Sequence, residues 1–330
     1  MVFTPVQAVA FEYDSCGEPA VLERRTRPLS PPGPHEVLVE ILTTGVNHMD
    51  ALIRRGDERE WDADAWPRAS GSDFAGIVRL CGPGVTAFRP GSAVIGHVRT
   101  GAHATHLIVS VSALVPKPKS VSWEVAGGMY LAGATALTTL EELRIGRDDT
   151  IVVSAAAGGV GSIEVQLAKH WGARVIGTCG ERNFDYLRQL GIIPVRYGEG
   201  IVERIQHVSH GPVTAFIDNF GKDGQGIAEA LAVPPGRYRS SADRRDVEAA
   251  LLRDDPESVR RGTAQLQRLA QLAEQGAFRL LVSGLYPLED IVEAYEDLDR
   301  MHSRGKILLA TNPVSTFRVT RARDVHEAMP

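Results

Sequence analysis

The stretch that decides the fold is TIVVSAAAGGVG, Thr150 to Gly161, in which a short apolar run enters a turn of small residues. The run of β-branched residues that starts at Ile151 predicts a buried strand. Apolar residues then recur at helical spacing from Val160 to Trp171. A strand, a tight turn and a helix in this order form a cradle for a pyrophosphate, because backbone N–H groups and the positive end of the helix dipole face the phosphates. We therefore expect this segment to bind a dinucleotide.

The turn, Ala155 to Gly159, lets the backbone come close to the phosphates. The residues expected to bind the cofactor there are Ala157, Gly158, Gly159 and Val160. Gly161 stands where a third glycine allows the helix to touch the strand, whereas Ala156 replaces the first glycine of the usual G-x-G-x-x-G pattern. The motif alone is therefore weak, and a glycine-rich turn of another α/β protein is the alternative. Ala173 to Thr178 supports the first interpretation, because it predicts a second buried strand and completes a βαβ unit.

Length and composition restrict the class of protein. The chain has 330 residues, which suits two domains, and 43% hydrophobic and 23% charged residues are typical of a globular protein. A net charge of -5 gives no general attraction to nucleic acid or to an anionic membrane, so we expect a small-molecule substrate. We find neither a secretory leader pattern nor an apolar stretch of about eighteen residues, and we expect a cytoplasmic protein. The three cysteines, Cys16, Cys81 and Cys179, indicate neither a disulfide framework nor a zinc cluster.

The pattern along the chain changes near residue 121. Residues 1–121 contain short β-like runs separated by Gly and Pro, whereas strands alternate with helices over residues 122–273. Residues 274–330 predict an apolar strand over residues 278–287, then a helix, a final strand and a polar tail. The fold class is therefore α/β, with a doubly wound parallel sheet in the central segment.

Six segments together are similar to one known family, and each of them alone is modest. They are Thr43–Gly56 (TTGVNHMDALIRRG), Gly71–Val78 (GSDFAGIV), Gly133–Leu140 (GATALTTL), the AAAGGVG turn, Asp218–Gly221 (DNFG) and Tyr286–Leu309. Over nearly its whole length the chain resembles the medium-chain dehydrogenase/reductase superfamily, in particular its zinc-free quinone oxidoreductase branch. The resemblance implies a GroES-like β-barrel domain built from both ends of the chain, a Rossmann domain between them, and an active cleft at their junction.

The resemblance also bears on metal binding. The zinc-dependent branch has a cysteine where this chain has Asn47 and a histidine where it has Ser72, and neither residue is a normal zinc ligand. The loop of four cysteines that holds a structural zinc in that branch has no counterpart. His48, Asp50 and Asp73 are the residues that could be recruited instead. Without a Lewis acid, reduction of an already polarised acceptor is favoured over alcohol oxidation.

The end of the second strand predicts the choice of nicotinamide cofactor. NAD-preferring Rossmann proteins place an acidic residue there, whereas this chain has Thr178 and Cys179. Arg182 follows closely, and a guanidinium pairs well with a 2′-phosphate, so we predict NADPH. Glu181 would favour NADH if its side chain pointed into the ribose pocket. By the resemblance, Tyr197 borders the adenosine phosphate, although a packed tyrosine at a strand end is an equal alternative.

The resemblance assigns roles to residues of the cleft. Asn219, Phe220 and Lys306 would contact the cofactor, and Thr135 would lie beside the nicotinamide unless its hydroxyl is bonded to its own helix. Asn47 would face the substrate as an amide donor. His48 is a candidate proton donor because an imidazole titrates near neutral pH, with water as the leading alternative.

The leading hypothesis is an NADPH-dependent, zinc-independent reductase of quinones, α,β-unsaturated carbonyl compounds or enoyl thioesters, which forms a homodimer. A zinc-retaining alcohol dehydrogenase is one alternative. A non-catalytic NADPH-binding sensor or structural protein is the other.

Overall fold

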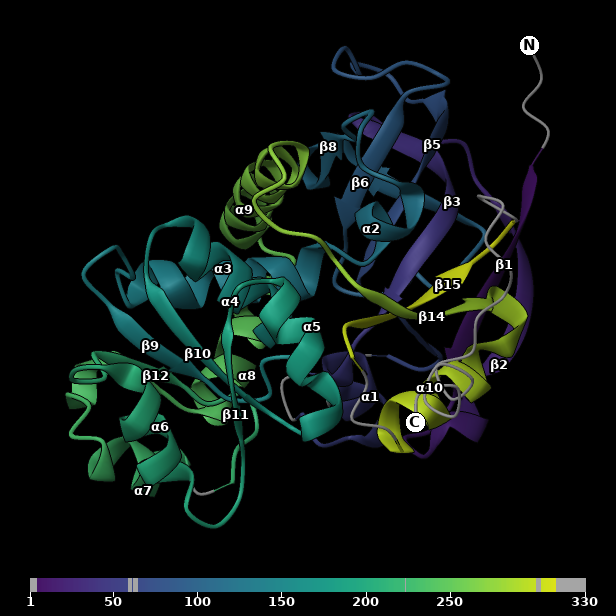
Figure 1. Cartoon of the computed structure of the whole chain (residues 1–330). Coiled ribbons are helices and arrows are strands. Elements are labelled where there is room, and N and C mark those ends of the chain that lie inside the picture. The colour runs from purple at the N-terminus through teal and green to yellow at the C-terminus, as the bar shows by residue number, and fades with distance from the viewer. Residues whose placement is uncertain (1–4, 59–60, 62–64, 223, 301–303, 313–330) are drawn as a thin grey trace.

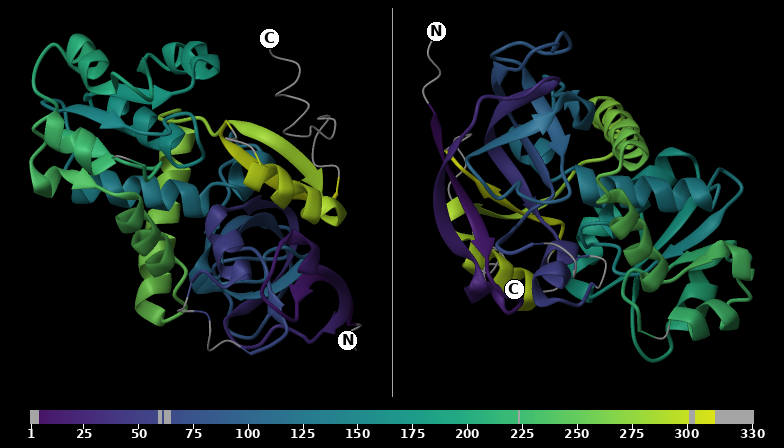
Figure 2. Two further views of the ribbon diagram at one scale, coloured as in Figure 1. Left: turned by 90° about the horizontal axis from the view of Figure 1, so that it is seen from below. Right: turned by 180° about the vertical axis from the view of Figure 1, so that it is seen from behind.

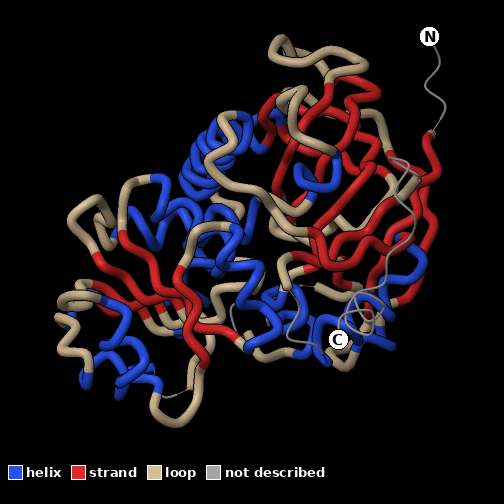
Figure 3. The backbone as a smooth tube through the Cα atoms, in the orientation of Figure 1, coloured by secondary structure: helices blue, strands red, loops and turns tan. Residues whose placement is uncertain are grey.

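The computed structural model describes residues 5–58, 61, 65–222, 224–300 and 304–312 (Figure 1). It confirms the α/β fold class. Strands gather in two groups, one in a barrel-like lobe and the other in a lobe with a parallel sheet (Figure 3). The two further views show that residues from both ends of the chain share the barrel lobe (Figure 2). The tail from residue 313 onward lies outside the described residues.

The barrel lobe is built on a seven-stranded sheet, in which β7 pairs with β3 beside the main path β14-β15-β3-β5-β6-β8. Its strands are β3 (Glu36–Val46), β5 (Asp73–Cys81), β6 (Ala93–His97), β7 (His106–Ser110), β8 (Leu114–Pro116), β14 (Val282–Pro287) and β15 (Lys306–Ala310). A three-stranded sheet accompanies it, with β1 (Val6–Tyr13), β2 (Glu23–Leu29) and β4 (Arg68–Ala69). Its helices are α1 (His48–Arg55), α2 (Trp123–Gly127) and α10 (Ile291–Arg300).

The antiparallel pairing of β15 with β3 is the feature that places the site. Ile307 is opposite Val46 in this register, so Lys306 lies where β3 ends and α1 begins. Residues 278–287 were expected to form one apolar strand, but only Val282–Pro287 does so. β14 pairs with β15 and not with the parallel sheet. A single chain does not test the predicted homodimer, which therefore stays a prediction.

The second lobe holds a parallel five-stranded sheet in the order β11-β10-β9-β12-β13. Its strands are β9 (Thr150–Val153), β10 (Arg174–Cys179), β11 (Ile193–Arg196), β12 (Ala215–Ile217) and β13 (Tyr238–Arg239). Its helices are α3 (Tyr130–Glu142), α4 (Gly161–His170), α5 (Phe184–Gln189), α6 (Ile201–Ser209), α7 (Gly224–Ala230), α8 (Ser241–Leu251) and α9 (Pro256–Glu274). The strand order reverses at β9, and ligands of doubly wound sheets bind at the carboxyl end of such strands.

One apolar core joins the two lobes. It extends from Met49 and Ile95 in the barrel lobe through Leu137 of α3 to Ile151 of β9, and all four side chains are buried. The two lobes are therefore in direct apolar contact beside the cleft that lies between them. Among the described residues, we find no helix with the length and apolar character needed to cross a lipid bilayer.

Candidate active site

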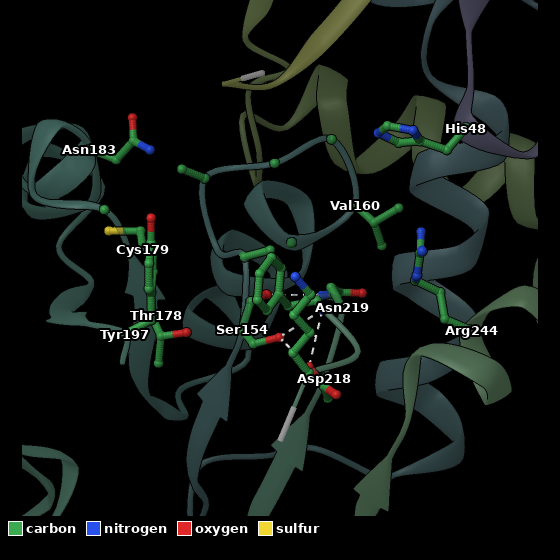
Figure 4. Close-up of a pocket in the computed structure, with 18 of the residues that line it drawn as sticks. His48, Ser154, Val160, Thr178, Cys179, Asn183, Tyr197, Asp218, Asn219 and Arg244 are labelled. Carbon is green, nitrogen blue, oxygen red and sulfur yellow. Dashed lines mark hydrogen bonds between the residues drawn. The ribbon is translucent and has the colours of Figure 1, made fainter. Parts of the chain in front are cut away.

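A cavity of about 1000 Å³ opens between the lobes (Figure 4). The structure brings nearly all of the predicted site residues to its wall. Those that line it are Asn47, His48, Ala157, Gly158, Gly159, Val160, Thr178, Cys179, Arg182, Tyr197, Asn219, Phe220 and Lys306. Thr135 is the exception. It is fully buried in α3 and its hydroxyl donates to Leu131 O at 2.7 Å, so Leu131 and Ala132 line the cavity instead.

The turn between β9 and α4 has the geometry of an anion cradle. Ala155 takes the left-handed region with φ 46°, and Gly158 N donates to Ala155 O at 2.9 Å. A Cβ on Gly161 would lie 2.5 Å from Ala155 O, which explains why glycine is required there. In the first turn of α4, Ser162 N donates to Gly158 O at 3.0 Å and Ile163 N to Val160 O at 2.9 Å, so the N–H groups that face phosphate oxygens would be those of the turn up to Gly161.

The cradle is also attached to the barrel lobe. Gly158 forms an isolated parallel bridge with Gly305, and Gly305 N donates to Ala157 O at 2.9 Å. Gly305 immediately precedes β15, so the phosphate cradle and the end of β3 are held close together. A ligand in the cradle therefore reaches the region around Asn47.

Hydrogen bonds fix the loop that follows β12 against the end of β9. Ser154 Oγ donates to Asp218 Oδ1 at 2.7 Å (Figure 4). The same carboxylate oxygen accepts from Phe220 N at 3.1 Å. These contacts hold Asn219 and Phe220 at the cavity wall. The rings of Phe220 and Tyr197 stack with centroids 6.2 Å apart.

A buried glutamate that the sequence analysis missed supports this loop. Glu164 in the first turn of α4 is fully buried, and its Oε2 accepts from Asn219 Nδ2 at 2.5 Å. Glu164 Oε1 and Asn219 Oδ1 are buried without a hydrogen-bond partner among the described residues. Burial raises the pKa of the Glu164 carboxyl to about 7. Its signal in the sequence was a charge between two apolar residues of a helix that packs on a sheet.

The raised pKa of Glu164 predicts how stability depends on pH. The carboxyl has an ordinary pKa of 4.5, so between about pH 4.5 and 7 the folded protein holds a proton that the unfolded chain releases. The free energy of unfolding should therefore fall as the pH rises through this window, by on the order of 3 kcal/mol from this group. Glu164→Gln should remove that part of the pH dependence and raise Tm at pH 8, measured by thermal denaturation. Parallel Tm–pH curves for variant and wild type would contradict the assignment.

The end of β10 contributes three of the predicted site residues to the cavity wall. Thr178, Cys179 and Arg182 line the cavity. Glu181, which could have favoured NADH, is ion-paired with Arg196 at 3.1 Å, and neither of these two residues lines the cavity. The cationic Arg182 thus remains at the wall while the nearby carboxylate is directed elsewhere.

A buried polar cluster surrounds Asn47, where β3 ends and α1 begins. Asn47 Nδ2 donates to Asp73 Oδ1 at 2.9 Å and to Asp50 Oδ2 at 3.1 Å. Asn47 Oδ1 accepts from Lys306 Nζ, which also donates to Val46 O at 3.1 Å. Both amide hydrogens of Asn47 are thus directed to carboxylates, which differs from the expectation that Asn47 donates to a substrate. We define Asn47, Asp50, Asp73 and Lys306 as the Asn47 cluster.

The two carboxyls of the Asn47 cluster have raised pKa values. Burial, with the neighbouring Asp73 next in importance, raises the pKa of Asp50 to about 7. Burial also raises the pKa of Asp73, against the opposing effect of Lys306. Two buried carboxyls this close favour retention of one proton, which leaves the Lys306 ammonium matched by about one negative charge.

His48 is exposed to the cavity and faces Arg244 of α8 across it (Figure 4). Desolvation by the surrounding protein lowers the pKa of His48 to about 4, and the charges of Arg244 and Lys306 contribute. The imidazole is therefore neutral at pH 7 and a poor source of a proton.

We predict that His48→Gln keeps kcat/KM for acceptor reduction within about threefold of wild type between pH 5 and 8, because the wild-type ring does not titrate there. Steady-state rates across this range are the measurement. A basic limb near pH 6.5 that is present in wild type and absent in the variant would show that His48 is the acid.

Helix α8 supplies cavity residues that the sequence analysis did not assign. Arg244 and Glu248 both line the cavity and form an ion pair at 3.0 Å. Ser240 caps the helix in a capping box with Asp243, and this S-x-x-D pattern was the available signal. The side chain that faces the cavity still could not be foreseen, because it depends on how α8 packs beside α1.

Comparison with known proteins identifies the family. The family model described as "Alcohol dehydrogenase GroES-like domain" matches residues 33–130, and the model described as "Zinc-binding dehydrogenase" matches residues 194–309. A quinone oxidoreductase of Salmonella typhimurium is 33% identical over 224 residues, covering 66% of this chain and 67% of that protein. The chain belongs to the medium-chain dehydrogenase/reductase superfamily. Within it, the chain lies in the quinone oxidoreductase-like branch.

Two further relatives of this superfamily match nearly the whole chain. A chloroplast envelope quinone oxidoreductase homolog of Arabidopsis thaliana is 27% identical over 328 residues, covering 91% of this chain and 97% of that protein. The crystal structure of Escherichia coli quinone oxidoreductase complexed with NADPH superposes with a TM-score of 0.77 at 25% identity, covering 92% of this chain and 99% of that one. The expected family and fold are therefore confirmed.

Proposed function

We propose that the protein is an NADPH-dependent reductase that transfers hydride to a quinone, or to the C=C bond of an α,β-unsaturated carbonyl compound or enoyl thioester, without a metal ion. The observation that carries this proposal is that the phosphate cradle and the Asn47 cluster line one cavity. Quinone oxidoreductase relatives act on small molecules, and the Escherichia coli relative was crystallised with NADPH.

The residues present fit NADPH. The turn Ala157–Val160 and the N-terminus of α4 would hold the pyrophosphate, and Arg182 would pair with the 2′-phosphate. Asn219 Oδ1, buried without a partner among the described residues, is an acceptor for a ligand N–H or O–H group. When bound, the reduced nicotinamide supplies hydride. The residues of the protein bind and orient the cofactor and the acceptor, and they stabilise the negative charge that develops on the acceptor.

The residues present do not fit zinc. Asn47 offers an amide that is already bonded to two carboxylates and to the Lys306 ammonium, so a divalent cation there would meet a cation. Ser72 offers a hydroxyl, which is not a usual zinc ligand. Within the described parts of the chain, no group of three His, Cys, Asp or Glu side chains is placed to hold a metal. These contacts support metal-independent chemistry and disfavour the alcohol dehydrogenase alternative.

The test is a panel of acceptors assayed with NADPH and with NADH. We expect NADPH oxidation with at least one quinone, enone or enoyl thioester, and weaker turnover with NADH. Tight NADPH binding without turnover on any acceptor would contradict the reductase function and favour the non-catalytic alternative.

A further inference from the structure

We propose that Lys306 is a catalytic residue whose ammonium donates an N–H to the carbonyl oxygen of the acceptor, beside Asn47 at the cavity wall. This inference rests on the proposed reductase function and deepens it. Lys306 was expected from the resemblance to contact the cofactor, but its ammonium is directed to the barrel lobe. It donates to Val46 O at 3.1 Å and to Asn47 Oδ1.

The geometry leaves one N–H of Lys306 available. An ammonium has three N–H donors, and within the described residues Lys306 Nζ has two acceptors. Lys306 is 4% exposed and lines the cavity with Asn47. A buried ammonium gains from a third acceptor, because an unsatisfied charged donor away from water is costly. A substrate oxygen in the cavity would supply that acceptor.

The stem of Lys306 passes close to two glycines, Gly159 and Gly128. A Cβ on Gly159 would lie 3.2 Å from Lys306 Cδ, and a Cβ on Gly128 would lie 3.6 Å from Lys306 Cε. The stem therefore runs from the phosphate cradle toward the Asn47 cluster, and the ammonium lies beyond the cradle. This path separates the charge of Lys306 from the turn that would hold the pyrophosphate.

Asn47, Asp50 and Asp73 act as positioning residues for the ammonium. The Asn47 amide accepts from Lys306 and donates to both carboxyls, so its orientation is fixed from both ends. When hydride adds to the β-carbon of an enone, the C=C π pair forms a new π bond between the α-carbon and the carbonyl carbon, and the carbonyl π pair moves to oxygen, which gives an enolate. The Lys306 N–H stabilises this oxyanion in a site of low dielectric, and water then protonates the α-carbon.

The experiment compares Lys306→Met with wild type, with Lys119→Met as a matched control at an exposed position. We expect Lys306→Met to lower kcat for enone reduction by about 10²-fold, as loss of one oxyanion donor does, while the Kd of NADPH changes by less than about threefold.

Because Lys306→Met leaves two buried carboxyls without their cation, Lys306→Met/Asp73→Asn is compared with Asp73→Asn as a second pair. A kcat within threefold of the reference in both pairs would overturn the inference. A Kd of NADPH weakened by tenfold or more with kcat retained would overturn it as well.

A binding measurement keeps the inference separate from the proposed function. p-Nitrophenol is titrated in the complex of the protein with NADP⁺, where its absorbance reports ionisation. We expect wild type and Lys119→Met to lower the apparent pKa of the bound phenol by about 1, and Lys306→Met not to do so. An unchanged phenol pKa in wild type would overturn the inference. A wild type that reduces no acceptor contradicts the proposed function, and the titration then decides the role of Lys306 by itself.

Discussion

Gly161→Val is expected to abolish NADPH binding, with Kd weakened by more than about 100-fold. A Cβ at this position would lie 2.5 Å from Ala155 O and 3.1 Å from Ala156 Cα, and these are backbone atoms that cannot rotate away. The turn must therefore move, and the phosphates lose both the close backbone and the N–H groups of α4. Fluorescence titration with NADPH is the measurement.

Gly226→Val is the matched control. Gly226 is exposed on α7, and nothing lies within 4 Å of a Cβ added there, so this variant should bind NADPH as wild type does. Circular dichroism of both variants separates a displaced turn from global unfolding. Wild-type affinity in folded Gly161→Val would show that the cofactor does not use this turn.

Arg182→Ala is expected to lower the preference for NADPH over NADH by about 10- to 100-fold. Arg182 lines the cavity beyond the end of β10, where its guanidinium can form charge-assisted hydrogen bonds with a 2′-phosphate. The loss should appear in kcat/KM for NADPH, whereas kcat/KM for NADH should change little because NADH lacks that phosphate. Steady-state kinetics with both cofactors on one quinone is the measurement.

Arg188→Ala serves as the control, since Arg188 is paired with Asp185 on α5 and does not line the cavity. A preference for NADPH that is equal in Arg182→Ala, Arg188→Ala and wild type would show that another residue recognises the phosphate.

The parts of the fold that local sequence determines were predictable. One βαβ unit contains the β-branched run at Ile151, the small-residue turn and the apolar helix positions up to Trp171. Each of these is recognised from neighbouring residues alone, by periodicity or by residue size. The strand over 278–287 was wrong in its first part, because apolar content alone does not distinguish a strand from buried irregular chain.

The sequence predicted which residues line the candidate site better than it predicted the contacts between them. Lys306 and Asn47 are 259 positions apart, so the sequence could not reveal that the ammonium binds the amide. The direction of Glu181 likewise depends on Arg196 of the neighbouring strand. Thr135 was placed beside the nicotinamide by resemblance, and its hydroxyl instead satisfies a carbonyl of its own helix.

The most direct test of the account measures NADPH oxidation by protein that has been treated with a strong chelator and analysed for metal content. We expect undiminished turnover on a quinone or enone with less than about one metal ion per ten chains, because the Asn47 amide is bonded to an ammonium and to two carboxylates and so does not fit zinc. Loss of turnover on chelation, with recovery on addition of zinc, would contradict the account.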